Sequence, residues 1–275
     1  MKTKLFIILM VATTLFFSCD SDTSTGPSED MLVVRGFLYA NEPVWDIQIT
    51  QTLELGSADS TAPPINNAQV VLVKNETVYE LVASDGDSGY YHYAGQDLNI
   101  ESGDKFEIQV TNGEQSASGQ TTVPTPPSGL ALDKSTITVM SFTGGFPGQG
   151  GFDRESLELN VTWDEDSDAL FYVVIENLEV NPVEIETGFK GGSGNRRFVF
   201  PPTNRNQYRI NAMSLTHLGK HVVRVYRVNQ EYADLYGTRE QDSRELNEPL
   251  TNITGGLGVF SAFSSISAEF QVISQ

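Results

Sequence analysis

The sequence predicts an all-β protein that contains two tandem antiparallel β-sandwich domains, preceded by a short leader and a flexible tether. Three observations lead to this prediction. Short apolar runs with period-two alternation recur along the chain from Leu32 onward. Gly, Pro, Asn and Asp residues separate these runs at the spacing of hairpin turns. A single segment, near residue 230, has the periodicity of a helix.

Residues 1–18 have the three zones of a secretory signal peptide. Lys2 and Lys4 form a basic start, residues 5–17 form an apolar run, and the small Ser18 precedes Cys19. The run is too short for a membrane-spanning helix, which needs about 20 apolar residues. Residues 15–19 resemble the lipobox that lipoprotein signal peptidase reads. We therefore expect cleavage before Cys19 and acylation of its thiol by chains such as palmitate.

The cysteine content supports this interpretation of the leader. Cys19 is the only cysteine in the sequence, so an exported chain has no disulfide framework and its thiol needs another role. More than one acyl chain would anchor the protein stably to a membrane. The alternative is an ordinary signal peptide with an incidental cysteine. Residues 20–30 lack large apolar side chains, which makes residues 19–30 an acylated cysteine with a flexible tether.

The chain is strongly acidic. It has 17 Lys and Arg residues against 36 Asp and Glu residues, a formal net charge of −19. This charge repels phosphate backbones and anionic lipid headgroups, so nucleic acid is not an expected partner. Cations, neutral glycans and basic protein surfaces are the more plausible soluble partners. The alternative is that the acidity serves only solubility.

Residues 31–125 predict the first sandwich. The expected strands are rich in β-branched and aromatic residues and are bounded by turn signals such as Asp85-Gly86 and Asn112-Gly113. They cover residues 32–39, 45–50, 68–73, 77–82, 106–110 and 118–123. Pro126 and Pro127 then interrupt the pattern, because two prolines stiffen a linker and cannot lie in a central strand. We expect the domain boundary at this point.

Residues 126–275 predict the second sandwich. Its expected strands cover residues 130–142, 157–163, 170–175, 197–200, 207–215, 222–228, 257–260 and 268–273. One short helix is expected over residues 229–237, where Tyr232, Leu235 and Tyr236 fall at i, i+3 and i+4. Asn229 can cap its start and Gly237 can end it.

Two loops of the second sandwich contain candidate binding residues. Asp164, Asp166 and Asp168 lie in an acidic loop between two expected strands, where carboxylate oxygens could bind a calcium ion. The alternative is a solvated acidic loop without an ion. Phe146 and Phe152 lie in a glycine-rich loop and could contact a partner or the face of a sugar. The alternative is that both rings fold back onto the sheet.

Several other patterns favour structural roles. His217 and His221 are four residues apart, but the intervening residues indicate a turn between strands and no His-Glu-x-x-His pattern accompanies them. The glycines of residues 255–258 are expected to allow a tight bend or bulge into the strand that follows. No Gly-x-Ser-x-Gly elbow is present, and acylation of Cys19 would exclude thiol catalysis. The sequence therefore predicts no catalytic residues.

Resemblances to known modules and to one family refine these expectations. Residues 64–123 resemble the small immunoglobulin-like sandwich of transthyretin-like and carboxypeptidase regulatory-like modules, and Pro126-Pro127, Leu130, Trp163 and Tyr172 resemble the start of a fibronectin type III domain. The whole chain resembles a family of Bacteroidota lipoproteins catalogued as domain of unknown function 4249, through its lipobox, residues 32–37 and residues 249–260. This resemblance implies an outer-membrane lipoprotein of unknown activity, often associated with TonB-dependent receptor systems.

These observations together predict a lipid-anchored, non-enzymatic accessory or binding component of an outer-membrane assembly. The alternatives are a surface protein that binds glycans or peptides and a hydrolase that uses carboxylates such as Asp164 or Asp166. No cofactor is expected beyond the calcium ion considered above. Asp20-Ser21-Asp22 resembles the short signal that sends such lipoproteins to the cell surface. We therefore expect a cell-surface protein, with the periplasmic face as the alternative.

Overall fold

The computed structural model describes residues 30–53, 61–139, 157–164, 166, 169–185, 196–237 and 251–274. Contacts divide the chain into one unit over Met1–Asp30 and a second over Met31–Gln275. The second unit is described below, and it begins where the expected tether ends. Its described residues form strands, one α-helix and a short 3-10 helix. The predicted all-β class is confirmed.

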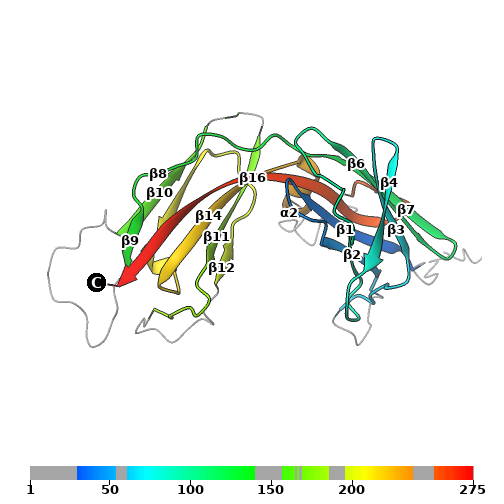
Figure 1. Cartoon of the computed structure of the whole chain (residues 1–275), viewed down its shortest axis with the longest axis horizontal. Helices are drawn as coiled ribbons and strands as arrows, with labels where there is room; N and C mark the ends of the chain where they lie inside the picture. Colours follow the sequence, from blue (N-terminus) through cyan, green and yellow to red (C-terminus); the bar gives the residue numbers. More distant parts are fainter. Residues whose placement is uncertain are drawn as a thin grey trace, which may run out of the picture. The chain divides into compact units, whose positions relative to one another are not determined.

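The first half of the unit is a sandwich of seven strands (Figure 1). They are β1 (Leu32–Tyr39), β2 (Asp46–Gln51), β3 (Gln69–Lys74), β4 (Thr77–Ala83), β5 (Tyr90–His92), β6 (Lys105–Asn112) and β7 (Gln115–Thr122). One layer contains β1, β2 and β5, the other contains β3, β6 and β7, and β4 pairs with both β5 and β3. Alternate side chains of the layers meet in a core that includes Ile47, Leu72 and Ile108, each with no exposed surface.

The second half is a sandwich of two further layers. Its elements are β8 (Ala131–Leu132), β9 (Thr136–Val139), β10 (Glu158–Thr162), β11 (Leu170–Asn177), β12 (Arg197–Val199), β13 (Gln207–Asn211), η2 (Ala212–Ser214), β14 (Gly219–Val228), α2 (Gln230–Gly237) and β16 (Leu257–Ser274). The short β15 (Ile253–Thr254) pairs with β7 and belongs to the first sandwich. One layer has the order β12-β11-β14-β16, with β9 also paired to β16, and the other has the order β13-β10-β8. Leu159, Trp163 and Val223 lie in the core between them.

One strand, β16, belongs to both sandwiches. Its first part pairs in parallel with β1, and its second part pairs antiparallel with β14 (Figure 1). The period-two alternation continues along the strand, so that Phe260 and Ala262 enter the first core while Phe270 and Val272 enter the second. The sequence predicted two separate strands, over residues 257–260 and 268–273. The structure joins them through the serine-rich residues 261–267.

This strand changes two expectations about the architecture. The sheet is mixed rather than purely antiparallel, because β16 runs parallel to both β1 and β9. Residues up to Val123 supply most of the first core and residues from Ile137 onward supply the second, while the boundary expected at residues 125 and 126 stays a prediction. However, Ile253, Phe260 and Ala262 complete the first core although they follow the second in the sequence. The chain therefore passes between the two sandwiches three times, the last time within β16.

Glycines allow β16 to enter the first sandwich. Gly255 and Gly258 have φ angles of +76° and +113°, a backbone conformation that disfavours a side chain. A Cβ atom on Gly258 would also clash with the backbone oxygen of Val34 on β1. The expected bend into this strand is therefore present, and close backbone approach requires the glycines.

A third apolar cluster, mostly aromatic, covers the opposite face of the shared sheet. Phe37 of β1, Tyr226 of β14 and Phe263 of β16 pack there, and Tyr232 of α2 covers them. Glu231 fixes the start of α2 because its carboxylate accepts hydrogen bonds from Thr121 of β7 (2.8 Å) and Ser261 of β16 (3.3 Å). The helix expected over residues 229–237 is thus confirmed as α2. In the described ranges, no helix is long and apolar enough to cross a membrane.

Candidate functional site

The face of β1, β2 and β5 that points away from the first core contains polar and aromatic side chains. Alternation along β1 directs Leu32, Val34 and Leu38 into the core and leaves Arg35 and Tyr39 on the opposite side. Strand register then aligns Arg35 with Gln48 of β2, and Gln48 with Tyr90 of β5. Asp46 begins β2, and Trp45 directly precedes it. We call this surface the Arg35–Trp45 face, and it consists of Arg35, Tyr39, Trp45, Asp46, Gln48 and Tyr90.

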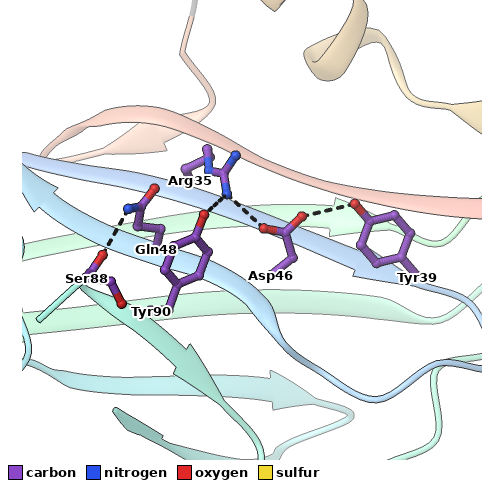
Figure 2. A network of polar contacts seen from close by, with 6 residues as sticks. All are labelled: Arg35, Tyr39, Asp46, Gln48, Ser88 and Tyr90. Carbon is purple, nitrogen blue, oxygen red and sulfur yellow. Dashed lines mark hydrogen bonds and ion pairs between the residues drawn. The ribbon is translucent and has the colours of Figure 1, made fainter. Parts of the chain in front are cut away.

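Asp46 is the centre of a hydrogen-bond network on this face (Figure 2). Its Oδ1 atom accepts from Arg35 Nη2 at 2.8 Å, and its Oδ2 atom accepts from the Tyr39 hydroxyl at 3.1 Å. Arg35 Nη2 also donates to the Tyr90 hydroxyl at 2.7 Å, and Gln48 Nε2 donates to the backbone oxygen of Ser88 at 2.9 Å. Asp46 is only 8% exposed, so the network supplies its buried carboxylate with a cation and a second donor.

The environment of Tyr39 keeps its hydroxyl protonated. Burial is the main cause that raises the pKa of Tyr39 far above its usual value, and the negative charge of Asp46 and the hydrogen bond to it raise the pKa further. The hydroxyl is therefore a hydrogen-bond donor throughout the physiological pH range. Arg35 is likewise a permanent cation. Both groups therefore act as donors to Asp46.

Stacked rings connect this face to the buried aromatic cluster. Phe263 is 2% exposed, and its ring stacks on Tyr39 with centroids 5.2 Å apart. Tyr39 in turn stacks on Trp45 at 5.5 Å, with an angle of 8° between the ring planes. Trp45 nevertheless remains 51% exposed. The stack thus holds a large, half-exposed indole in one orientation at the protein surface.

The arrangement offers several groups that can bind a ligand. Hydrolysis of glycosides generally uses two carboxyl groups that face each other across the bond to be cleaved. On this face, the Asp46 carboxylate is buried and already paired with Arg35. Arg35, whose side chain is 41% exposed, also lies over the rings of Phe37 and Tyr90 at 5.5 and 5.6 Å. An oriented indole and a positioned guanidinium group on one face can both contact a bound ligand.

Comparison with known proteins gives a family but no function. A family model described as a domain of unknown function, DUF4249, matches residues 17–269. The chain belongs to this family. The match includes both the Arg35–Trp45 face and Cys19. No protein with a curated description matches the sequence significantly. A crystal structure of titin domains is similar to 88% of the chain, with 11% sequence identity and a TM-score of 0.21, and the chain covers 66% of that structure.

The acidic loop of this DUF4249 protein has partners within the chain. The Asp164 carboxylate accepts a hydrogen bond from the Ser128 hydroxyl at 2.7 Å, and Asp166 forms an ion pair with Arg227 at 2.8 Å. Asp168 lies outside the described residues. Among the residues that the structure covers, no three His, Cys, Asp or Glu side chains are grouped so that they could hold a metal ion. Calcium binding by this loop stays a prediction.

The remaining predicted site residues of the DUF4249 protein are not all described. Cys19, Phe146 and Phe152 lie outside the described ranges. His221 is described and buried: its Nδ1 atom donates to the backbone oxygen of Gly219 at 3.0 Å, and its Nε2 atom accepts from the amide of Asn177 at 3.3 Å. Burial lowers the pKa of His221 and keeps the ring neutral. The buried ring thus joins β14 to Asn177 at the end of β11.

Sequence reasoning missed the Arg35–Trp45 face of this DUF4249 protein. One signal was present, because an arginine and two aromatic residues alternate with apolar residues in β1 and must share a face. The pairing of β1 with β2, which brings Asp46 to Arg35, is a tertiary contact that the alternation does not specify. Trp45 lay at the first position of an expected strand, where exposure could not be judged.

Proposed function

We propose that this DUF4249 protein is a lipid-anchored, non-enzymatic component of an outer-membrane assembly, of the kind built around a TonB-dependent receptor, and that it binds a ligand on the Arg35–Trp45 face. The observation that supports the binding role is the half-exposed indole of Trp45, which Tyr39 holds on the same face as Arg35. In this proposal Cys19 attaches the protein to the membrane and residues 20–30 form the tether.

The exposure of Trp45 is the energetic argument for a binding role. A tryptophan side chain buries up to about 250 Å², so half of it leaves roughly 100 Å² of apolar surface in water. At about 25 cal/mol per Å², a ligand that covers this area would gain about 2–3 kcal/mol before other terms are counted. Because the Tyr39 stack already fixes the ring, little side-chain entropy is lost on binding. Tryptophan, tyrosine and arginine are also the residue types that dominate binding hot spots.

The sequence supports the anchor. Ser18 and Cys19 follow an apolar leader, and Cys19 is the only cysteine in the sequence. Each buried CH₂ group of an acyl chain contributes about 0.8 kcal/mol, so several chains on one cysteine hold a protein stably at a membrane. Asp20 and Asp22 follow directly, and we propose that they direct the protein to the cell surface.

Acylation and assembly can be tested with one pair of proteins. Cells that express the full-length chain or its Cys19→Ala variant are labelled with an alkyne analogue of palmitate, and the protein is then purified from native membranes. We expect label and a co-purified outer-membrane receptor with the natural chain, and neither with Cys19→Ala. An unlabelled natural chain would contradict the anchor. Repeated recovery of a labelled protein without any partner would contradict the assembly.

Cell-surface placement has a separate test. Protease added to intact cells should cleave the natural protein, while a periplasmic marker protein remains intact. Full protection of the protein in the same sample would place it on the periplasmic face instead.

A further inference from the structure

We propose that the ligand of the Arg35–Trp45 face is a neutral sugar ring, which stacks its C–H face on Trp45 and hydrogen-bonds through its hydroxyl groups to Arg35 and Tyr90. This inference rests on the proposed function, since it takes the same face as the binding face. It adds the chemical class of the ligand.

The aromatic part of the face suits a flat ligand. Trp45 is 51% exposed, and its orientation is set by the nearly parallel Tyr39 ring at 5.5 Å. Tyr39 is held at its other contacts by Phe263 and by its hydrogen bond to Asp46. A pyranose ring presents axial C–H groups on a flat side, so it can cover an indole that cannot rotate away. The platform therefore exists before the ligand arrives.

The polar part of the face suits hydroxyl groups. Arg35 has five N–H donors, and its side chain is 41% exposed, while its Nη2 atom is held by Asp46 and Tyr90. Arg35 and the Tyr39 hydroxyl donate to the two oxygens of the same carboxylate, so Asp46 links the guanidinium group to the ring that supports Trp45. Tyr90 is part-buried and its hydroxyl can both donate and accept. These groups provide fixed hydrogen-bond partners next to an apolar platform, which is the combination that sugars require.

Charge and surface chemistry favour a neutral sugar over other ligands. The sequence has a net charge of −19, which repels acidic glycans. The one cation of the face, Arg35, is already neutralised by Asp46 at 2.8 Å, so the face offers no free charge to an anion. Stable protein interfaces are centred on a contiguous apolar core. Trp45 is instead followed along β2 by Asp46 and Gln48.

Intrinsic fluorescence gives a direct readout of this site. The sequence has two tryptophans, of which Trp45 is 51% exposed and Trp163 is 3% exposed. Purified full-length protein in a zwitterionic detergent, chosen because it has no sugar headgroup, is titrated with neutral hexasaccharides of glucose, mannose, galactose and xylose. A polygalacturonate hexamer serves as the charged comparison. We expect a saturable emission change with at least one neutral probe, and no such change with the acidic probe.

Variants locate the binding to this face. Trp45→Ala should weaken binding of the responding sugar by roughly tenfold or more in calorimetry, because it removes the stacking surface. Arg35→Met should weaken binding while the protein stays folded. Met213→Ala, at a side chain 82% exposed on the second sandwich, should bind as the natural chain does.

Three outcomes would overturn the inference. The first is that no neutral probe gives a saturable response at millimolar concentration. The second is that the acidic probe binds more tightly than the neutral probes, and the third is that Met213→Ala loses as much binding as Trp45→Ala. The proposed function fails in a different way, through loss of acyl label or of the co-purified receptor. A protein that is acylated and co-purifies with its receptor but binds no sugar would refute the sugar alone.

Discussion

Replacement of Phe260 by alanine tests whether β16 makes the two sandwiches unfold together. Phe260 is fully buried in the first core, and it lies on the strand whose later residues, including Phe270, fill the second core. Loss of the first sandwich would free residues 257–263 from β1 and would also break the third cluster around Phe263. We therefore expect damage to one core to destabilise both.

The size of the effect follows from the burial. A buried phenylalanine that becomes alanine costs about 3–5 kcal/mol of unfolding free energy. For 150–250 residues, each kcal/mol shifts the melting temperature by about 2–4 °C, so Phe260→Ala should lower it by roughly 6–20 °C. Phe270→Ala, at a residue 3% exposed on the same strand, is the matched variant in the second core. Val180→Ala, at an 89% exposed residue, should change stability by less than about 0.5 kcal/mol.

The assay reads the two sandwiches separately. Urea unfolding is followed by pulsed hydrogen–deuterium exchange and mass spectrometry, with peptides from β6 reporting the first sandwich and peptides from β10 reporting the second. We expect both sets of peptides to lose protection at the same urea concentration, and both variants to shift the two midpoints equally. The reasoning is refuted if Phe260→Ala shifts only the β6 peptides while Phe270→Ala shifts only the β10 peptides.

Three further variants test the glycine bend, the polar network and the buried histidine. Gly258→Ala should lower the free energy of unfolding in urea by at least about 2 kcal/mol, and by more than Gly86→Ala does. Both glycines have a positive φ, but only a Cβ on Gly258 would clash with backbone atoms, so equal losses would refute the close approach. Asp46→Asn should lower the free energy of unfolding by about 1–3 kcal/mol and increase acrylamide quenching of Trp45 fluorescence. Unchanged stability and quenching would show that the network does not hold the Trp45 ring in place. Burial lowers the pKa of His221 in the folded state, so stability should be complete above the usual imidazole pKa of about 6.5 and fall as the pH drops below it toward the lowered value. The urea midpoint of the natural chain and of His221→Gln is measured between pH 5 and pH 7. If the midpoint of the variant depends on pH as steeply as that of the natural chain, groups other than His221 cause the dependence.

Local patterns predicted the elements of the fold well because their causes are local. The alternation of residues 32–39 gave β1 at the observed bounds, and the spacing of Tyr232 and Leu235 gave the helix that is observed as α2. The glycines of residues 255–258 gave a bend that the structure contains. Each of these features depends on side chains a few residues apart, which a sequence displays directly.

Long-range pairing could not be predicted in the same way. Residues 261–267 are rich in serine, so the alternation there is weak and β16 was expected as two strands. Its parallel pairing with β1 joins residues more than 200 positions apart. No pattern within either strand specifies that partner. The consequence is that Phe260 and Ala262 were assigned to the second sandwich although they belong to the core of the first.

The Arg35–Trp45 face depends on the same kind of long-range contact. Alternation alone places Arg35 and Tyr39 on one side of β1, but it does not show which carboxylate they share. The register of β1 and β2 brings Asp46 to both donors, and β16 supplies the Phe263 ring that supports Tyr39. The expected site residues came instead from composition: an acidic loop and a glycine-rich loop, where residue types suggest chemistry without a partner.

Site-specific photo-crosslinking in intact cells tests the central claim most directly. A photo-reactive residue replaces Gln48, which lies on the Arg35–Trp45 face, or Gln271, which lies exposed on the second part of β16. If this face is the binding face of an anchored protein, crosslinking at position 48 should give an adduct of higher mass in the membrane fraction, and Trp45→Ala should abolish that adduct. Position 271 should give none. The absence of any adduct at position 48, or adducts of equal yield at both positions, would contradict the account.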